Sequence, residues 1–141
     1  MANTVLFKPD HLEYMRVQKG EPEEIAGIPG VSSTLTSIGA KSIIAEDGTI
    51  LGIIGLVPTL PGACEVFILA SEDQDAHSVG FARGVLRELL EIKPKYRRIQ
   101  AVTSVNNLVH QRFIAWLGFV KEGTLKKYGL KGDDMVMWGL T

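Results

Sequence analysis

The fold is decided by the stretch Asn107-Leu-Val-His-Gln-Arg-Phe-Ile-Ala-Trp-Leu-Gly-Phe-Val-Lys-Glu-Gly123. Asn106 or Asn107 can cap a helix, because an asparagine oxygen accepts a hydrogen bond from an unpaired N–H group of the first turn. The helix is expected to run to Leu117 and to stop at Gly118, since glycine readily takes the left-handed conformation that ends many helices. The stretch therefore predicts a capped helix followed directly by a strand over residues 119–128.

Short apolar runs outside this stretch predict six more strands. They cover residues 4–7, 42–45, 50–57, 64–70, 99–105 and 135–140. Asp47-Gly48 lies between two of these runs and predicts a two-residue hairpin loop in which both residues have positive φ. Pro61-Gly62 predicts the next turn, so residues 42–70 are expected to form a meander of three antiparallel strands.

Helical spacing of apolar residues predicts a long helix over residues 78–92, preceded by a polar loop over residues 71–76. Ser78 or Asp75 can cap its start, and Pro94 ends it. The expected core face consists of Val79, Ala82, Leu86, Leu89 and Leu90.

A shorter helix is expected over residues 11–18, with Leu12, Met15 and Tyr14 buried, and short helical pieces are expected over residues 20–39.

The long helix joins the strands expected at residues 64–70 and 99–105. Such a crossover implies that these two strands are parallel. The expected fold class is therefore α/β (α+β), with a mixed central sheet of about six to seven strands and helices on both faces. The whole chain, residues 1–141, is expected to form a single domain.

Composition excludes several classes of function. The net charge of −1 argues against a nucleic-acid binder that works through bulk positive charge. Cys64 is the only cysteine, which excludes an internal disulfide and a zinc site built from cysteines. His11, His77 and His110 lack the spacing of metal ligands. With neither a membrane-spanning apolar run nor a signal-like start, we expect a cytoplasmic protein with no membrane partner.

The quoted stretch resembles the closing segment of the GNAT superfamily of N-acetyltransferases. In that family an Asn-capped helix ends in Leu-Gly-Phe and the next strand begins with Lys-Glu-Gly, as here at residues 117–119 and 121–123. The order of the expected elements is also the GNAT order, and the resemblance covers roughly residues 40–128. It implies the GNAT fold, acetyl-CoA as co-substrate, and transfer of an acetyl group to a small-molecule or protein amine.

A second resemblance concerns the start of the long helix. GNAT enzymes carry a Gln/Arg-x-x-Gly-x-Gly/Ala motif whose backbone N–H groups hold the pyrophosphate of coenzyme A, a task that suits a helix N-terminus. The corresponding residues here are His77, Ser78, Val79, Gly80, Phe81 and Ala82.

Two residues of this motif have alternative roles. Gly80 can equally serve helix packing, and His77, which replaces the expected Gln or Arg, can equally be a surface histidine. The neighbouring residues Glu72, Asp73 and Asp75 would repel a pyrophosphate if they pointed toward it.

The resemblance also implies catalytic roles. Glu65 is the candidate general base, with a solvent-facing strand carboxylate as the alternative. The backbone of Phe67, Ile68 and Leu69 would pair with the pantetheine arm, and one of their N–H groups would polarise the thioester carbonyl.

The general acid has no direct counterpart in this chain. Many GNAT enzymes place an acidic tyrosine where this chain has Ile114, which cannot donate a proton. His110 can replace that acid or can simply bond a nearby loop. Asn107 is assigned to the cofactor site.

A looser resemblance links the chain to small phage-encoded proteins with GNAT-like domains, through an Asn-x-x-His-x-x-Phe spacing at residues 107–113. It is a hint about origin. Ile114, His77 and the acidic residues before the long helix support an alternative function, a catalytically inactive structural or binding module, which would be virion-associated if it is of phage origin. Exposed strand edges near the C-terminus favour a homodimer. We expect Trp116 and Trp138 to be packing residues, Cys64 to be a core residue, and the basic residues between Lys93 and Arg98 to be solvated.

Overall fold

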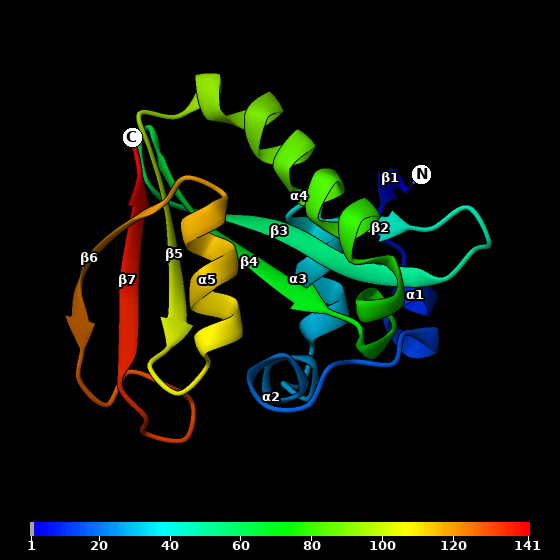
Figure 1. The fold of residues 1–141 in the computed structure, drawn as a ribbon, viewed down its shortest axis with the longest axis horizontal. Helices are drawn as coiled ribbons and strands as arrows, with labels where there is room; N and C mark the ends of the chain where they lie inside the picture. The colour runs from blue at the N-terminus through cyan, green and yellow to red at the C-terminus, as the bar shows by residue number, and fades with distance from the viewer. Residues whose placement is uncertain (1) are drawn as a thin grey trace. The chain divides into compact units, whose positions relative to one another are not determined.

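The computed structural model describes residues 2–141 (Figure 1). Within them seven strands form one mixed sheet in the order β1-β2-β3-β4-β5-β7-β6. The strands are β1 (Asn3–Leu6), β2 (Lys41–Ile44), β3 (Ile50–Leu60), β4 (Ala63–Ala70), β5 (Arg98–Ser104), β6 (Val120–Leu125) and β7 (Met135–Leu140). The helices are α1 (Pro9–Tyr14), α2 (Glu21–Ala26), α3 (Val31–Ser37), η1 (Glu72–His77), α4 (Ser78–Ile92), η2 (Lys93–Lys95) and α5 (Leu108–Trp116), where η marks a 3-10 helix.

The chain divides into two compact units. The first unit comprises the residues up to Leu56 together with Phe67–Glu91, and the second comprises Val57–Val66 together with Ile92–Thr141. The expectation of a single domain stays a prediction.

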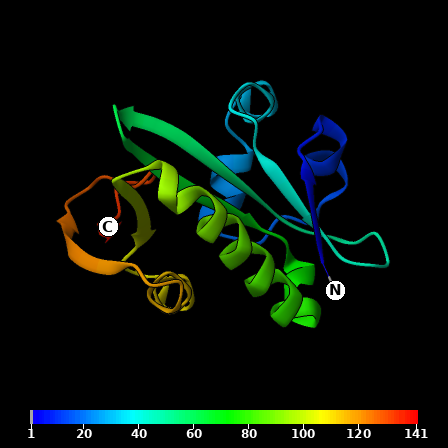
Figure 2. The ribbon, with the colours of Figure 1, turned by 90° about the horizontal axis from the view of Figure 1, so that it is seen from above.

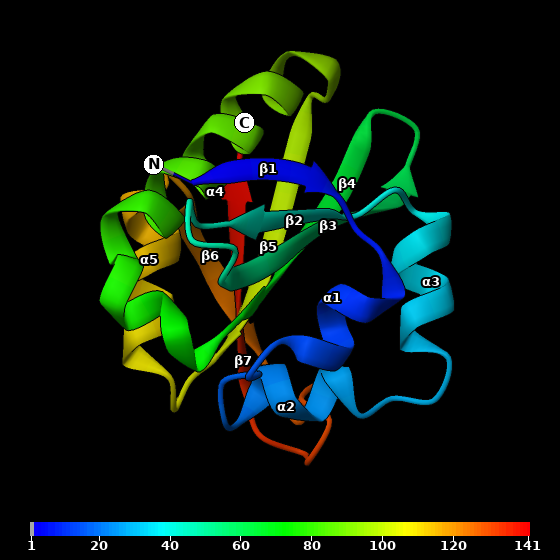
Figure 3. The same ribbon diagram turned by 90° about the vertical axis from the view of Figure 1, so that its right-hand side faces the viewer.

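In the first unit β1, β2 and β3 run antiparallel side by side (Figure 3). One face of these strands receives α4 at two points where a glycine leaves room. A Cβ atom on Gly84 of α4 would lie 3.0 Å from Ile43 Cγ2, and a Cβ atom on Gly52 would lie 2.6 Å from Phe81 Cε1. Because Ile43 and Gly52 are register partners on β2 and β3, both contacts lie on the same face.

The opposite face of these strands carries the core of the first unit. Ile53 and Leu69 lie there, fully buried, and pack with Phe7, Met15, Leu35 and Ala40. Figure 2 shows α1 and α3 on this side and α4 on the other. Helices therefore cover both faces, as the sequence predicts.

In the second unit β5, β7 and β6 lie side by side (Figure 1). β4 pairs in parallel with β5 over three residues, from Ala63 with Arg98 to Glu65 with Gln100. The parallel pairing expected from the crossover is confirmed. β7 is antiparallel to both of its neighbours, and its pairing with β6 is interrupted by a bulge at Glu122.

The hairpin at Asp47-Gly48 is confirmed, but the prediction of a two-residue loop is wrong. Ala45 N donates to Thr49 O and Gly48 N donates to Ala45 O, each at 2.9 Å, so three residues form the loop. Only Gly48 has a positive φ, of 89°. This is a type I turn closed by a left-handed glycine, and Asp47 Oδ1 stabilises it by accepting the N–H of Thr49 at 3.0 Å.

The predicted helix over residues 11–18 is also wrong at its end. α1 stops at Tyr14, whose side chain is 74% exposed, while Met15 is buried as expected. The next residues pair with the end of β4 instead. Gln18 N donates to Ala70 O at 2.9 Å, and Glu72 N donates to Arg16 O at 2.7 Å.

The bounds of α4 are as predicted, but its core face is rotated. Phe81, Val85 and Leu89 form the buried row, whereas Val79 is 61% exposed and Leu90 is 62% exposed. The row follows i, i+4 spacing, and periodicity alone did not separate it from the neighbouring apolar residues.

Candidate functional site

The segment before α4 is helical, although the sequence predicted a polar loop there. Residues 72–77 form η1, which Ser71 caps by accepting the N–H of Asp73 at 3.0 Å. Ser78 has helical angles, so neither Ser78 nor Asp75 is the N-cap of α4, and this prediction is wrong. The first turn of α4, with Ser78, Val79 and Gly80, therefore continues directly from η1.

The acidic residues before α4 have a cationic partner within the first unit. Arg16 donates to Glu72 Oε2 at 3.1 Å and to Asp73 Oδ1 at 3.0 Å, and Asp75 accepts from the amide of Gln74 at 2.7 Å. Two of the three expected repulsive charges are thus turned toward a guanidinium. The sequence did not identify Arg16, because nothing in its neighbourhood reveals the pairing of residues 16–18 with the end of β4.

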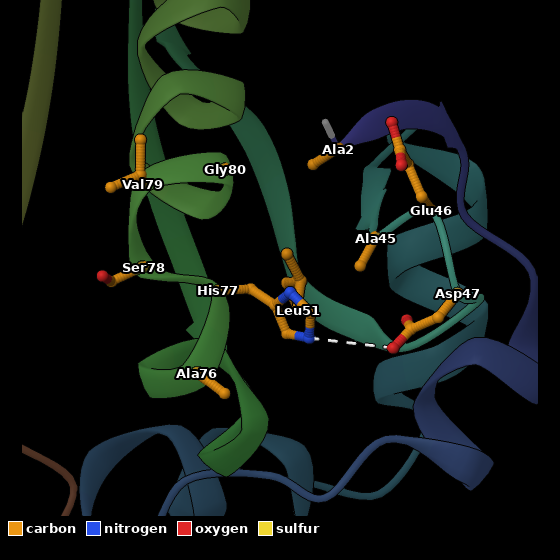
Figure 4. A pocket seen from close by; sticks show the side chains of 10 residues that line it. All are labelled: Ala2, Ala45, Glu46, Asp47, Leu51, Ala76, His77, Ser78, Val79 and Gly80. Carbon is orange, nitrogen blue, oxygen red and sulfur yellow. Dashed lines mark ion pairs between the residues drawn. The ribbon is translucent and has the colours of Figure 1, made fainter.

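A pocket of about 430 Å³ opens beside the first turn of α4 (Figure 4). Its lining residues are Ala2, Ala45, Glu46, Asp47, Leu51, Ala76, His77, Ser78, Val79 and Gly80. His77 Nε2 lies 3.9 Å from Asp47 Oδ2. Hydrogen bonds from the backbone and side chain of Thr49 lower the pKa of Asp47, so this carboxylate is negative at neutral pH.

Gly80 is not required for packing. A Cβ atom there would lie 3.5 Å from the Cβ of Ala2, an ordinary contact. Gly84 is the glycine on which the packing of α4 depends, because its Cβ would press on the fully buried Ile43. The packing alternative for Gly80 therefore loses its physical basis.

The side chains of Phe67, Ile68 and Leu69 serve the first unit. Leu69 belongs to its buried core, and the ring of Phe67 fills the space above Gly55, where a Cβ would lie 2.6 Å from Phe67 Cε1. Ile68 is half-buried. The role expected of this segment toward a ligand concerns its backbone groups.

Glu65 belongs to the second unit and lies half-buried in a chain of hydrogen bonds. Gln100 Nε2 donates to Glu65 Oε1 at 2.9 Å, and Arg98 Nε donates to Gln100 Oε1 at 3.1 Å. Arg98 also forms a two-point ion pair with Glu122, at 3.0 and 2.6 Å, which lowers the pKa of Glu122. The Glu65 carboxylate is thus fixed by a hydrogen bond. Arg98 is engaged with Gln100 and Glu122, so the prediction that it is solvated is wrong.

Asn107 and His110 form the start of α5. Asn107 Oδ1 accepts the backbone N–H of His110 at 3.0 Å, which makes Asn107 the cap and confirms this prediction. Gly118 ends the helix with φ of 105°. Burial lowers the pKa of His110, so its imidazole is neutral at pH 7 and is poorly suited to donate a proton.

The remaining candidates are structural. Ile114 is buried, and so is Cys64, whose pKa is raised by burial, so it is not an activated nucleophile. Trp138 is buried and donates to Thr103 Oγ1 at 2.9 Å, as a packing residue should. Trp116, in contrast, is 56% exposed and stacks on Phe113, so the packing prediction is wrong for it.

Residues 2–141 contain no group of three or more His, Cys, Asp or Glu that could bind a metal ion. None of the helices in this range combines the length and the apolar character needed to cross a membrane.

Solved structures share this backbone. The acetyltransferase of the GNAT family from Bacillus anthracis superposes with a TM-score of 0.71 at 15% identity, covering 99% of this chain and 93% of its own. Ard1 from Thermoplasma volcanium superposes with a TM-score of 0.77 at 13% identity, covering 99% of this chain and 96% of its own. The chain has the GNAT fold. A ribosomal-protein-S5-alanine acetyltransferase from Vibrio fischeri shares it with a TM-score of 0.72 at 16% identity, covering 99% and 92%.

By sequence, neither a protein-family model nor a curated protein matches this GNAT-fold chain. The similarity is therefore carried by the backbone, and the sequence motifs have diverged.

Proposed function

We propose that this chain is an N-acetyltransferase that moves an acetyl group from acetyl-CoA to an amine. The observation that carries the proposal is the agreement of its backbone with GNAT acetyltransferases along 98–99% of the chain. Gly80 supports it further, because a glycine costs helix stability and this one has no packing role in its own unit. A glycine at this point allows a ligand to approach the backbone closely.

The residues present fit the co-substrate in three respects. We assign the pyrophosphate to backbone N–H groups of residues 77–82, at the junction of η1 and α4, and Arg16 reduces the opposing charge of Glu72 and Asp73. The ladder between β4 and β5 ends at Glu65, and the backbone of residues 67–69 continues β4 beyond it. That backbone would bind the pantetheine arm, and Asn107 would lie at the cofactor site as the cap of α5.

Acetyl-CoA, when bound, supplies an acetyl group activated as a thioester. Glu65 acts as general base, taking a proton from the ammonium of the acceptor, directly or through water, so that the nitrogen lone pair can attack the carbonyl carbon. The N–C bond forms, the C–S bond breaks, the sulfur leaves as a thiolate, and the nitrogen releases its second proton. With Ile114 buried and His110 neutral, water carries that proton to the thiolate.

The acceptor is an amine on a small molecule or a protein. Two chains of this fold are named for such substrates, a spermidine N-acetyltransferase from Vibrio cholerae and the ribosomal-protein-S5-alanine acetyltransferase. We place the reaction in the cytoplasm. Self-association through the edge strand β6 stays a prediction.

A second function is favoured by one observation, the lack of an evident proton donor at Ile114 and His110. In this alternative the chain is a GNAT-shaped binding or structural module without catalysis. Such a module would bind its ligand without transferring an acetyl group.

Thermal unfolding with added acetyl-CoA tests the proposal. Ligand at a hundredfold of its dissociation constant should add about 2.7 kcal/mol to the unfolding free energy. Gly80→Glu should abolish this stabilisation, because it places a negative charge in the first turn of α4, whereas Gly80→Ala should fold and bind more weakly, because its Cβ hinders close approach to the backbone. The absence of any stabilisation at millimolar acetyl-CoA would exclude the enzyme. Stabilisation of the Gly80→Glu variant equal to that of the parent would show that the pyrophosphate lies elsewhere.

A further inference from the structure

One row of residues crosses the strands of the second unit. Glu65 on β4 is the register partner of Gln100 on β5, and Gln100 is the partner of Gly139 on β7. Register partners point to the same face of a sheet. The row therefore starts with a carboxylate, continues with an amide and then has a glycine with no side chain.

The orientation of the Gln100 amide is fixed by Arg98. A glutamine side chain can present either its oxygen or its NH₂ group to a neighbour. Arg98 Nε occupies the oxygen at 3.1 Å, so the NH₂ group is the end that faces Glu65, at 2.9 Å. Arg98 thus ensures that Glu65 accepts a hydrogen bond from the Gln100 NH₂ group.

Arg98 is itself held by Glu122. Its two terminal nitrogens bond both oxygens of Glu122, at 3.0 and 2.6 Å, while its Nε remains directed at Gln100. Glu122 lies at the bulge of β6, where the register shifts between Lys121 and Gly123. Bulges redirect side chains and recur beside active sites.

Gly139 provides the space for this ion pair. A Cβ atom on Gly139 would collide with the Glu122 carboxylate and lie 2.9 Å from Arg98 Nη1. The ion pair therefore passes over β7 at the one position of the row that has no side chain. Gly139 lacks a positive φ, so its backbone gives no separate reason for a glycine.

We propose that Glu122, Arg98 and Gln100 are positioning residues that hold the Glu65 carboxylate for catalysis, in an arrangement that Gly139 makes room for. The inference rests on the proposed function, in which Glu65 is the general base. None of the three touches the reacting atoms. Their effect on the rate is indirect, because a base that is held in place spends a larger fraction of time in the orientation that can accept the proton.

The arrangement has a spectroscopic test that does not depend on activity. In ¹H–¹⁵N NMR spectra of the full chain, the Arg98 Nε–H signal and the downfield Gln100 amide proton should exchange slowly with water. Gly139→Ala should abolish both features by displacing Glu122. Gly123→Ala, on the adjacent strand, is the matched control, because a Cβ there has no neighbour within 4 Å. Retention of both signals in Gly139→Ala would overturn the proposal.

Kinetics test the consequence. Arg98→Lys, which keeps the charge but loses the Nε donor, and Gln100→Leu should each lower kcat about tenfold, with KM for acetyl-CoA changed less than about twofold. These variants also serve if Gly139→Ala does not fold. Gly123→Ala should match the parent chain. Unchanged kcat after loss of the signals would overturn the positioning role.

The two proposals fail in different ways. A parent chain with both slow-exchanging signals but no acetyl transfer would refute the acetyltransferase and still support the arrangement around Glu65. An active parent chain whose rate is insensitive to Arg98→Lys and Gln100→Leu would refute the positioning role alone.

Discussion

Gly80 and Gly84 lie one turn apart on α4 but face different neighbours. Gly80→Ala should raise the unfolding free energy by about 0.5–1 kcal/mol, because alanine suits a helix better and the new Cβ meets Ala2 at an ordinary 3.5 Å. Gly84→Ala should lower it by about 1 kcal/mol, because a Cβ 3.0 Å from the buried Ile43 overpacks the core. Urea denaturation of the two variants measures both, and equal changes would contradict the packing roles.

The burial of His110 makes stability depend on pH. Its pKa is lowered in the folded chain, so above the unfolded-state pKa of about 6.5 both states hold a neutral imidazole and stability is complete. As the pH falls below that value the unfolded chain binds the proton first, and the unfolding free energy falls until the folded-state pKa is passed.

We therefore expect His110→Gln to lose less unfolding free energy than the parent chain between about pH 7.5 and pH 5. Denaturant titrations at both pH values give the comparison. Parallel pH profiles for the two chains would show that His110 is not shielded from water.

The burial of single residues could be predicted from the sequence where the residue type and its apolar neighbours decide it. Cys64 and Trp138 are buried as expected. Arg16 and Gln100 were missed, since their roles come from partners that lie 56 and 35 positions away in the chain. Such pairings between distant positions follow from the tertiary fold, which the two residue types alone do not reveal.

At the scale of elements, the start of α5 has a specific contribution to stability. Asn107→Ala removes the acceptor for the N–H of His110 and should lower the unfolding free energy by about 1 kcal/mol. Asn107→Asp keeps an acceptor in place and should retain most of the stability. If alanine and aspartate behave alike in thermal unfolding, the cap is not what stabilises this helix.

Regular elements were predicted to within a few residues where apolar periodicity is strong, as for α4 and β5. The failures lie at element ends. α1 ends early because Gln18 pairs with Ala70, and residues 72–77 coil into η1 because Ser71 caps them. Both causes are tertiary or specific hydrogen bonds that a periodic pattern does not contain.

At the scale of the whole molecule, the sheet could be predicted because the chain order restricts it strongly. A helix between two strands requires a parallel pair, and short turns require antiparallel ones. The carboxylate network around Glu65 could not be predicted, because it needs the order β5-β7-β6 and a bulge at Glu122.

The single thiol reports on opening of the folded chain as a whole. Cys64 is fully buried with a raised pKa, so it should react with a thiol reagent far more slowly in the native chain than in denaturant. A cysteine introduced at the exposed Ser33 of α3 should react quickly in both conditions. Fast labelling of Cys64 in the native chain would mean that β4 opens locally.

β7 lies between β5 and β6 although it follows both in the chain. During synthesis on the ribosome, β6 therefore emerges before the strand it must pair with, and residues 135–140 then have to insert between two strands rather than add to an edge. A nascent chain halted before Met135 would leave one side of β5 open, the state in which pairing with another chain is easiest. The insertion of residues 135–140 between β5 and β6 thus sets how long this unit is exposed to misassembly.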